Sequence, residues 1–451
     1  MSSLANNKIT NGVIWKQLLL FFFPIAIGTF FQQLYNMIDA IVVGQFIGKE
    51  ALASVGGSSS QIINFIVGFF TGFTSGASII IAQAYGAKDR RRVQRGLHTA
   101  YTLAALAGVA ISIIGVLLCK TFLRLMNTPQ EILESSALYL KIYFSGIIFV
   151  FIYNMGSGIL RASGDSKSPL YYLICCCIIN IVLDLAFVLI FKMGVAGVAL
   201  ATLIAQAVSA VLITLKLMRL KGIMRLYPKK AGIDSYILRS QLRIGLPTGF
   251  ESVLFGITNI SIQTALNSFG TDTMAAWSAY GKLDSFFWLI SSAFGISIST
   301  FVGQNYGAGK IDRVYKSTRV CLIMDLAATA FLVGIIMIFK EGLLRIFTSD
   351  AEVIEIGVRM ISLIAPWYAV FSFIEILSGS LRGTGNVLVP VLITLFGVCV
   401  LRIIWLATVL KIYPGLSVLI ASYPVTWVIT AAAFIVYYFV HKKRSLERLS
   451  K

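Results

Sequence analysis

The sequence predicts an all-α membrane protein with twelve transmembrane helices, arranged as two parallel six-helix repeats. Two observations predict this class: an apolar composition and an internal repeat of long apolar segments. Of the 451 residues, 57% are hydrophobic and only 13% are charged, and the mean hydropathy is +0.85. A soluble domain carries about 25% charged residues. A soluble enzyme of this composition would expose its excess apolar side chains to water, so a polytopic membrane protein is expected.

Each expected helix is a long apolar segment. Crossing a bilayer core of about 30 Å takes roughly 20 helical residues, and twelve segments reach that length. β-Barrel strands are excluded, because they would alternate apolar and polar residues over about ten positions. The first segment is too long for a signal peptide and is expected to stay attached. In order, the expected helices span residues 15–43, 55–83, 97–119, 137–160, 169–191, 194–217, 240–267, 276–303, 318–339, 356–381, 387–409 and 416–440.

The 38 basic and 19 acidic residues give a net charge of +19, and the position of the basic residues indicates topology. They lie in short segments between apolar runs, which does not favour a nucleic-acid partner. The two termini and the loops after even-numbered helices hold 27 of them, whereas the opposite side holds nine. Cytoplasmic loops carry the excess of Lys and Arg. Both termini are therefore expected in the cytoplasm, with the helices in the plasma (inner) membrane.

The six cysteines and two histidines form no metal-binding pattern. No CxxC or His-paired spacing occurs, so neither a zinc site nor a disulfide framework is expected. The cysteines lie in or near apolar segments and are interpreted as small buried hydrophobic residues.

The two halves of the sequence repeat. One constant offset places many residues of the first half on identical ones in the second, and the loop 217–240 is expected to link an N-lobe, 1–225, to a C-lobe, 226–451. Six helices per repeat is an even number, so both copies have the same orientation. Parallel repeats recur among transporters, although an old duplication without a transport role is an alternative. The matches include Gln83, Tyr85, Gly86, Arg92, Arg161 and Pro169 with Gln304, Tyr306, Gly307, Arg313, Arg382 and Pro390.

At these residues the chain resembles the multidrug and toxic compound extrusion (MATE) family of secondary transporters, over all twelve helices. Each motif is weak alone, but in register across two halves they are specific. The resemblance implies two lobes around a central cleft. The motifs are Pro24 with Gln-Gln-Leu-Tyr-Asn-Met-Ile-Asp-Ala at 32–40, Gln-Ala-Tyr-Gly-Ala at 83–87 with its echo at 304–308, and the loop 160–169 with its echo at 381–385.

The major facilitator fold is the alternative, since it also has twelve helices in two parallel halves. Its loop after helix 2 requires an Asp four residues after a Gly, and then a later Gly. Here Asp89 follows Gly86 by three residues, and the three arginines at 90–92 come next. The MATE resemblance is therefore preferred.

Polar residues on the first helix share one face. Gln32, Asn36 and Asp39 are spaced i, i+4 and i+7. A carboxylate among lipid tails costs several kcal/mol, so such residues usually face the interior of a bundle or a water path. We expect Asp39 to have a function and Gln32, Tyr35 and Asn36 to line the substrate cleft. For a single polar residue, the alternative is a structural hydrogen bond between two helices.

A second acid, Asp184, follows Asn180 by one turn in helix 5. The resemblance implies that Asp39, Asn180 and Asp184 form a cation-coupling cluster in the N-lobe. Burial beside a like charge disfavours the ionised carboxylate, which would promote proton binding near neutral pH. An internal hydrogen-bond network without a coupling role is the alternative.

The second half carries its own charged residues. Glu251 lies four residues after Pro247, and Asn259 and Gln263 continue a polar stripe expected to line the cleft. The resemblance implies that Glu251 is the helix-7 acid of sodium-coupled members. The partner acid of helix 10 is expected where Phe371 stands, so whether Glu375 replaces it stays open.

Further charges lie in or at the edge of spans. An unpaired Arg at membrane depth is costly, so Arg402 is expected to pair with Glu375 or Glu251. Lys282 and Asp284 could pair in the same way, and all four are assigned to the substrate cleft, with structural ion pairing as the alternative. Asp325 is expected near a headgroup or in a packing contact.

Pro24 removes a backbone hydrogen bond from the first helix. The resemblance implies that this helix bends during transport, so Pro24 is the expected conformational hinge, with a static kink as the alternative. Most of the aromatic residues are expected to pack, and some could attract organic cations in the cleft.

The resemblance predicts an antiporter that exports amphipathic or cationic organic compounds in exchange for H⁺ or Na⁺ by alternating access. Coupling requires the ion to bind the two states with different affinity. We expect a monomer with small organic substrates and the lipid bilayer as partners. No cofactor, catalytic residue or metal is expected, apart from a sodium site.

Rival functions are a flippase or exporter of lipid-linked precursors, a membrane-embedded enzyme and a channel. A flippase would carry more cationic charge in its cavity. An enzyme is disfavoured because the sequence offers no nucleophile–base pair, and the segment 86–92 lacks the ending of a phosphate-binding loop.

Overall fold

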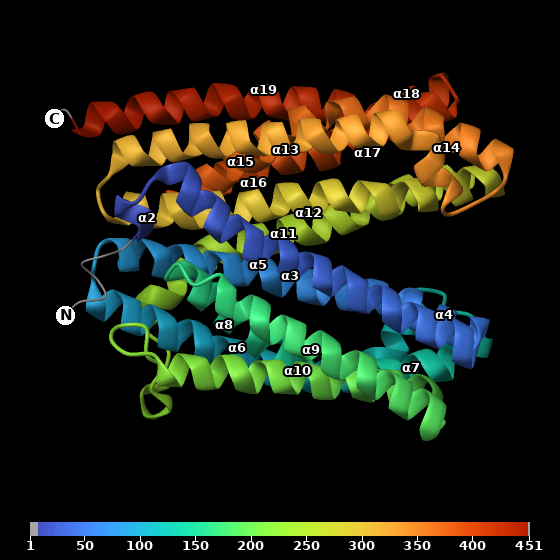
Figure 1. Cartoon of the computed structure of the whole chain (residues 1–451), viewed down its shortest axis with the longest axis horizontal. Helices are drawn as coiled ribbons and strands as arrows, with labels where there is room; N and C mark the ends of the chain where they lie inside the picture. The colour runs from blue at the N-terminus through green and yellow to red at the C-terminus, as the bar shows by residue number, and fades with distance from the viewer. Residues whose placement is uncertain (1–7, 450–451) are drawn as a thin grey trace. The chain divides into compact units, whose positions relative to one another are not determined.

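The structure, a computed structural model, describes the backbone of residues 8–449 and the side chains of 8–444 (Figure 1). Every regular element in that part of the chain is a helix. The elements of the first half are α2 (Lys8–Asn11), α3 (Ile14–Val42), η1 (Val43–Ile47), α4 (Lys49–Gly56), α5 (Ser58–Gly86), α6 (Arg90–Leu125), α7 (Gln130–Ser145), α8 (Ile147–Ala162), α9 (Lys167–Leu185), η2 (Ala186–Ile190) and α10 (Gly194–Arg219).

A linker with the short helix η3 (Pro228–Lys230) leads into the second half. The second half contains α11 (Ser235–Asn267), α12 (Thr271–Gly307), α13 (Ile311–Arg345), α14 (Ala351–Ile364), η4 (Ala365–Trp367), α15 (Tyr368–Gly383), α16 (Leu388–Thr394), η5 (Leu395–Val400), α17 (Leu401–Ala407), α18 (Val409–Ile412) and α19 (Leu416–Leu449).

The predicted repeat is visible in the helix boundaries and in the packing. The offset that places Gln83 on Gln304 also carries the bounds of α8 onto those of α15, and it carries the start of α6 onto the start of α13. In the first half α8 packs against α5, α6 and α10; in the second half α15 packs against α12, α13 and α19. The equivalent helices therefore make equivalent contacts.

Ten helical segments of the described chain are long and apolar enough to cross a membrane, and the bent pair α7–α8 makes eleven. The remaining expected span, 240–267, is α11. It is more polar than the others because Glu251, Asn259 and Gln263 lie along it. The expected span 137–160 is the pair α7–α8, which bends by 48° where Ser145 and Ile147 flank Gly146. The expected span 356–381 is likewise divided, by η4.

Spatial proximity divides the chain into two compact units. The first unit contains Leu20–Gly249, and the second contains Lys8–Leu19 together with the residues from Phe250 onward. The division lies within α11 rather than in the loop 217–240. The start of α3 therefore groups with the second unit, and the start of α11 groups with the first.

Glycines allow α11 to lie directly on α5 in the first unit. A Cβ atom added at Gly72 would lie 2.5 Å from the backbone nitrogen of Gly249, and one added at Gly76 would lie 2.5 Å from that of Gly245. Both distances are too short for non-bonded atoms. The two backbones are thus in contact because neither helix has a side chain at the crossing.

Each unit has a core of its own that joins its central helices. In the first unit Phe70 of α5 stacks on Phe151 of α8, with ring centroids 3.7 Å apart. In the second unit Phe287 of α12 stacks on Tyr368 of α15 at 4.0 Å. These buried aromatic pairs join α5 to α8 in the first unit and α12 to α15 in the second.

The linker is bound to the start of α6. The Gln94 side-chain amide donates hydrogen bonds to the backbone oxygens of Ile223 and Arg225, at 2.5 and 3.1 Å. The backbone N–H of Tyr227 donates to His98 Nε2 at 3.0 Å, and that of Asp234 donates to Thr99 Oγ1 at 3.0 Å. Side chains of α6 therefore hold the linker by its backbone.

Candidate functional site

Asp39 and Asp184 face one another in the first unit. Their carboxyl groups, one on α3 and one on α9, interact directly with one another. Asp184 is fully buried and Asp39 is partly buried. The structure thus brings together the two acids that the sequence assigned to one cluster.

The oxygen atoms of this pair lack hydrogen-bond donors. Both carboxylate oxygens of Asp184, Oδ1 of Asp39 and Oδ1 of Asn180 are buried without a donor among the described residues. No Lys or Arg of that part of the chain forms an ion pair with either acid. Buried carboxylates without partners are costly, so this site is suited to a proton or a small cation.

Neutral polar groups surround the pair. The Asn180 amide lies 3.4 Å from Thr202 Oγ1 on α10, and the phenol groups of Tyr35 and Tyr139 are close enough to interact with Asp39. Thr202 and Tyr139 were not predicted, because each is an isolated polar residue within an apolar segment. We call Asp39, Asn180, Asp184 and Thr202 the acidic cluster.

The other polar residues of the predicted stripe on α3 are more exposed than Asp39. Gln32 and Asn36 are exposed, and Cys177 of α9 packs against the Phe31 backbone oxygen at 3.6 Å. Pro24 lies inside α3, which continues without interruption from Ile14 to Val42. The hinge assigned to Pro24 stays a prediction.

In the second unit Glu251 is paired with Arg382. The Arg382 guanidinium Nη1 lies 3.5 Å from Glu251 Oε2, and both side chains are largely buried. Glu375 interacts with the same guanidinium and with Glu251. One arginine therefore compensates two acids, in contrast to the uncompensated pair of the first unit.

Glu375 packs against the α12 backbone. A Cβ atom added at Gly295 would overlap the Glu375 carboxylate, so the acid occupies space that a glycine leaves open. Asp325 of α13 is fully buried and interacts with Ser372 and Glu375. The sequence predicted either a headgroup or a packing contact for Asp325, and in the structure it is a buried neighbour of Glu375.

Arg402 was expected to pair with Glu251 or Glu375, but it does not. Its guanidinium lies 4.0 Å from the centre of the Tyr423 ring and donates a hydrogen bond to Thr426 Oγ1 at 3.1 Å. The side chain is 2% exposed. A planar, weakly hydrated guanidinium stacks well on an aromatic face, so the ring supplies the electrostatic partner that the sequence assigned to a carboxylate.

Asp284 accepts three hydrogen bonds from aromatic side chains. Tyr368 donates at 2.5 Å, Trp288 at 2.7 Å and Tyr280 at 3.1 Å. Neither Lys282, which is exposed, nor any other cation of the described residues forms an ion pair with it. Lys282 and Asp284 were expected to pair with Glu251 or Glu375, and no such pair is found among the described residues.

Asp284 and Arg402 border a cavity of about 530 Å³ within the second unit. Four predicted cleft residues line it, whereas Lys282 and Glu375 do not. We call it the aromatic cavity, because its wall is mainly aromatic. Its lining is Phe255, Asn259, Gln263, Trp277, Tyr280, Gly281, Asp284, Trp288, Val398, Arg402, Tyr423 and Trp427.

Comparison with known proteins identifies the family. The sequence model of the MatE family matches residues 24–188 and 247–408. A probable multidrug resistance protein, YoeA of Bacillus subtilis (strain 168), is 30% identical and covers 99% of this chain and 98% of its own length. The probable multidrug resistance protein NorM of Thermotoga maritima is 28% identical, covering 86% of this chain and 84% of its own.

Solved structures have the same fold. A crystal structure of a MATE protein in the bent conformation superposes with a TM-score of 0.92 at 20% identity and covers 99% of both chains. A transporter of the MOP superfamily from Pyrococcus furiosus superposes with a TM-score of 0.90 at 21% identity, covering 98% of both chains. These matches confirm the predicted twelve-helix, two-lobe architecture, and the chain belongs to the multidrug and toxic compound extrusion family.

Proposed function

We propose that the protein is an ion-coupled antiporter that exports amphipathic or cationic organic compounds across the plasma membrane. The acidic cluster is the proposed coupling site, where H⁺ or Na⁺ binds. The observation that carries this proposal is the juxtaposition of Asp39 and Asp184, whose buried oxygens have no donor among the described residues. The family and the names of its relatives support transport of drug-like molecules.

Physical chemistry makes this cluster suited to coupling. Two adjacent carboxylates with no cation nearby repel one another, and taking up one positive charge removes that repulsion. A proton could be shared between the two carboxyl groups, and Na⁺ could use their oxygens with those of Asn180 and Thr202. If the affinity for the ion differs between inward- and outward-open states, ion binding shifts the equilibrium between them.

We propose a different role for Glu251 and Glu375 of the second unit. Arg382 already compensates Glu251 and Glu375, so an incoming cation would compete with a fixed guanidinium. This disfavours Glu251 as a primary coupling residue, although the sequence assigned it that role. We propose that the aromatic cavity contributes to the binding of organic substrates, with Asp284 as its negative charge.

The orientation follows from the loop charges. We propose that both termini are cytoplasmic, because the side of the membrane that holds them carries 27 of the 38 basic residues.

The test is dye efflux from proteoliposomes under separately imposed proton and sodium gradients. We expect one gradient to drive efflux in the wild type, and Asp39→Asn and Asp184→Asn to lower gradient-driven efflux at least tenfold. Glu251→Gln should retain most of it. Asp312→Asn removes an exposed acid and is the matched control.

Dye binding without a gradient separates loss of coupling from loss of folding. The two cluster variants should still bind dye. If both keep full gradient-driven efflux, the coupling site is elsewhere. If no dye of a broad panel is driven by either gradient while lipid-linked precursors are flipped, the flippase alternative replaces the antiporter.

A further inference from the structure

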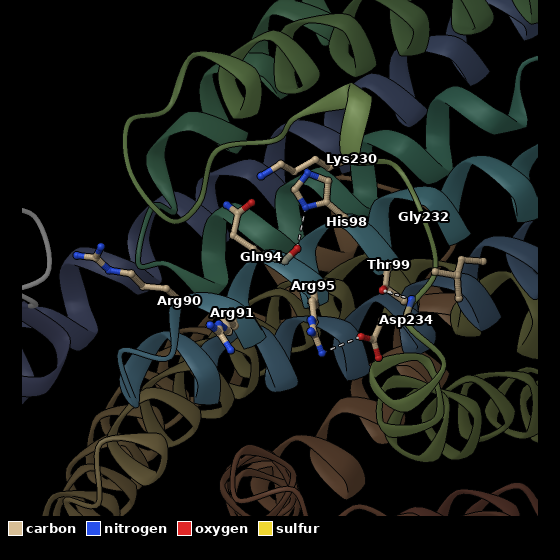
Figure 2. Close-up of a pocket in the computed structure, with 10 residues that line it drawn as sticks. Arg90, Arg91, Gln94, Arg95, His98, Thr99, Lys230, Gly232 and Asp234 are labelled. Atoms are coloured by element: carbon tan, nitrogen blue, oxygen red, sulfur yellow. Dashed lines mark hydrogen bonds and ion pairs between the residues drawn. The ribbon is translucent and has the colours of Figure 1, made fainter.

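A basic pocket lies between the start of α6 and the linker in the first unit (Figure 2). The cavity measures about 700 Å³, and residues of both segments line it. The proposed function does not use it. Its lining is Arg90, Arg91, Gln94, Arg95, His98, Thr99, Lys230, Gly232, Ile233 and Asp234.

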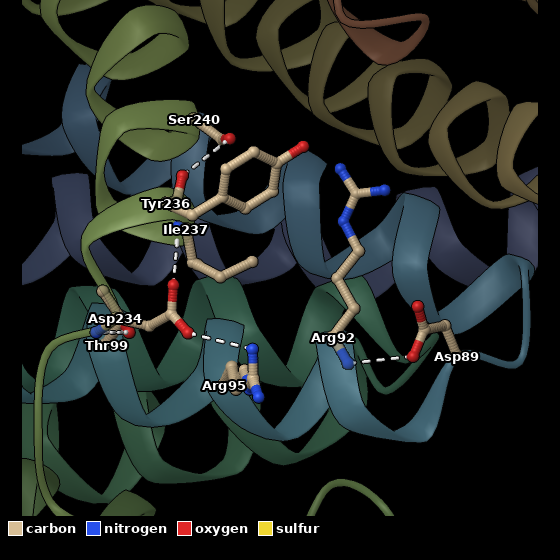
Figure 3. Close-up of polar contacts among 8 residues, drawn as sticks. All are labelled: Asp89, Arg92, Arg95, Thr99, Asp234, Tyr236, Ile237 and Ser240. Atoms are coloured by element: carbon tan, nitrogen blue, oxygen red, sulfur yellow. Dashed lines mark hydrogen bonds and ion pairs between the residues drawn. The ribbon is translucent and has the colours of Figure 1, made fainter.

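Most of the positive charge in this pocket is uncompensated. Its only carboxylate, Asp234, is paired with Arg95 at 3.3 Å, as Figure 3 shows. Arg90, Arg91 and Lys230 are exposed and form no ion pair with a described residue. Lys230 Nζ lies 5.1 Å from the centre of the Tyr227 ring, but none of the three cations is neutralised by a carboxylate of the described residues. Their common preference is an anion with several oxygen acceptors, such as a phosphate group.

The pocket is preformed, because hydrogen bonds fix its floor. His98 is 5% exposed and both ring nitrogens are used: Nδ1 bonds to the Gln94 backbone oxygen at 2.7 Å, and Nε2 bonds to the Tyr227 N–H. Asp234 also accepts from the Ile237 N–H at 3.0 Å at the start of α11 (Figure 3). A ligand would thus enter a built cavity and order little of the protein.

The equivalent position in the second unit shows that the free cations are not required by the fold. There Arg313 donates to the backbone oxygens of Ile9 and Gly12, at 2.8 Å each, and Lys310 donates to that of Thr10 at 3.0 Å. In the repeat, Arg90 and Arg91 correspond to Ile311 and Asp312. The excess charge is therefore particular to the first unit.

One apolar side chain lines the pocket together with the basic residues. This is Ile233, which is 41% exposed and precedes the spanning part of α11. α6 itself continues from the pocket as a membrane span with a mean hydropathy of 2.5. The pocket thus lies at the membrane surface, with cations beside apolar groups, which matches an amphiphile with an anionic head.

We propose that this pocket binds the headgroup of an anionic phospholipid from the membrane leaflet at this end of α6. Arg90, Arg91 and Lys230 supply the positive charge that attracts the phosphate, while Ile233 contacts the acyl chains. The lipid then joins α6 to the linker, which strengthens the attachment of the linker to the first unit.

The test compares lipid binding by the purified full-length protein and by the double variant Arg91→Gln/Lys230→Gln. The matched control, Arg219→Gln/Lys229→Gln, removes the same two charges at exposed positions outside the pocket. Phosphatidylglycerol and phosphatidylcholine are added to detergent-solubilised protein, and retained lipid is counted by native mass spectrometry. The thermal midpoint is measured alongside, with inorganic phosphate as a third addition.

We expect phosphatidylglycerol to be retained and to raise the thermal midpoint in the wild type and in the control. The pocket variant should bind it at least fivefold more weakly, while phosphatidylcholine and inorganic phosphate have no effect on any of the three. Equal retention by the pocket variant and the control would overturn the proposal. Stabilisation by inorganic phosphate equal to that by the lipid would also overturn it, since the site would then take a soluble anion. The single variant Arg91→Gln, at an exposed position, provides a second measurement if the double variant does not fold.

Discussion

Arg382 Nη1 lies 3.5 Å from Glu251 Oε2, and this contact ties the end of α15 to α11 inside the second unit. The same guanidinium compensates Glu375. In the first unit the acids Asp39 and Asp184, which lie at other positions of the repeat, interact with one another and with no cation of the described residues. The two repeats thus share a fold but differ in whether their buried acids carry a permanent partner, which separates a structural role from a proposed coupling role.

Arg382→Gln is expected to destabilise the protein, because it leaves two buried carboxylates uncompensated. Removing one partner of a buried ion pair costs about 3–5 kcal/mol. The measurement is thermal unfolding of detergent-solubilised protein. Arg359→Gln, at an exposed site, should leave the midpoint unchanged. The double variant Glu251→Gln/Arg382→Gln should recover part of the loss; a single variant as stable as the wild type would show that Arg382 does not compensate the acids.

Sequence reasoning predicted the architecture well because apolar length and the internal repeat can both be read directly from the chain. The boundaries of α8 and α15 follow the repeat closely. The bend at Gly146 was not predicted. A Cβ atom at that glycine would lie 2.6 Å from the Leu203 side chain of α10, and such a contact between helices cannot be read from the local sequence.

The charged sites were predicted only in part, for the same reason. Asp39 and Asp184 could be grouped from the family motif, but the partner of Arg402 could not be derived from spacing. Tyr423 lies on another helix, α19, and is an ordinary aromatic residue in an apolar segment. Arg382, placed in a loop by its neighbours in sequence, is in the last turn of α15. Which cation meets which acid is decided by the rotation of each helix.

Asp284→Asn is expected to weaken binding of cationic dyes about tenfold, while neutral amphiphiles bind as before. The carboxylate is the negative group of the aromatic cavity, and a tenfold change corresponds to about 1.4 kcal/mol. Fluorescence quenching by dyes matched in size measures both affinities. Asp312→Asn is the control for a lost acid outside the cavity. Equal weakening of both dye classes would instead indicate that Asp284 only holds Tyr280, Trp288 and Tyr368 in place.

Gly72→Ala is expected to destabilise the first unit. The added methyl group would lie 2.5 Å from the Gly249 nitrogen, so α5 and α11 would have to separate, and overpacking of this kind costs about 1–3 kcal/mol. Gly334→Ala is the matched control, because nothing lies within 4 Å of that position and alanine favours a helix. Unfolding midpoints of the two variants should therefore move in opposite directions or differ clearly; equal midpoints would argue against backbone contact at Gly72.

His98→Leu is expected to loosen the linker from α6. The Tyr227 N–H can only donate, so His98 Nε2 must be the acceptor and Nδ1 carries the hydrogen donated to the Gln94 backbone oxygen. A leucine leaves the Tyr227 N–H without this acceptor, at a cost of about 1–3 kcal/mol, whereas the Gln94 oxygen keeps its bond within α6. Trypsin should therefore cleave after Arg225, Lys229 or Lys230 at least fivefold faster than in the wild type, as followed by mass spectrometry of the fragments. His441→Leu replaces the chain's other histidine, on α19, and should leave the cleavage rate unchanged. Unchanged cleavage in His98→Leu would mean that Gln94 and Thr99 hold the linker without help from the histidine.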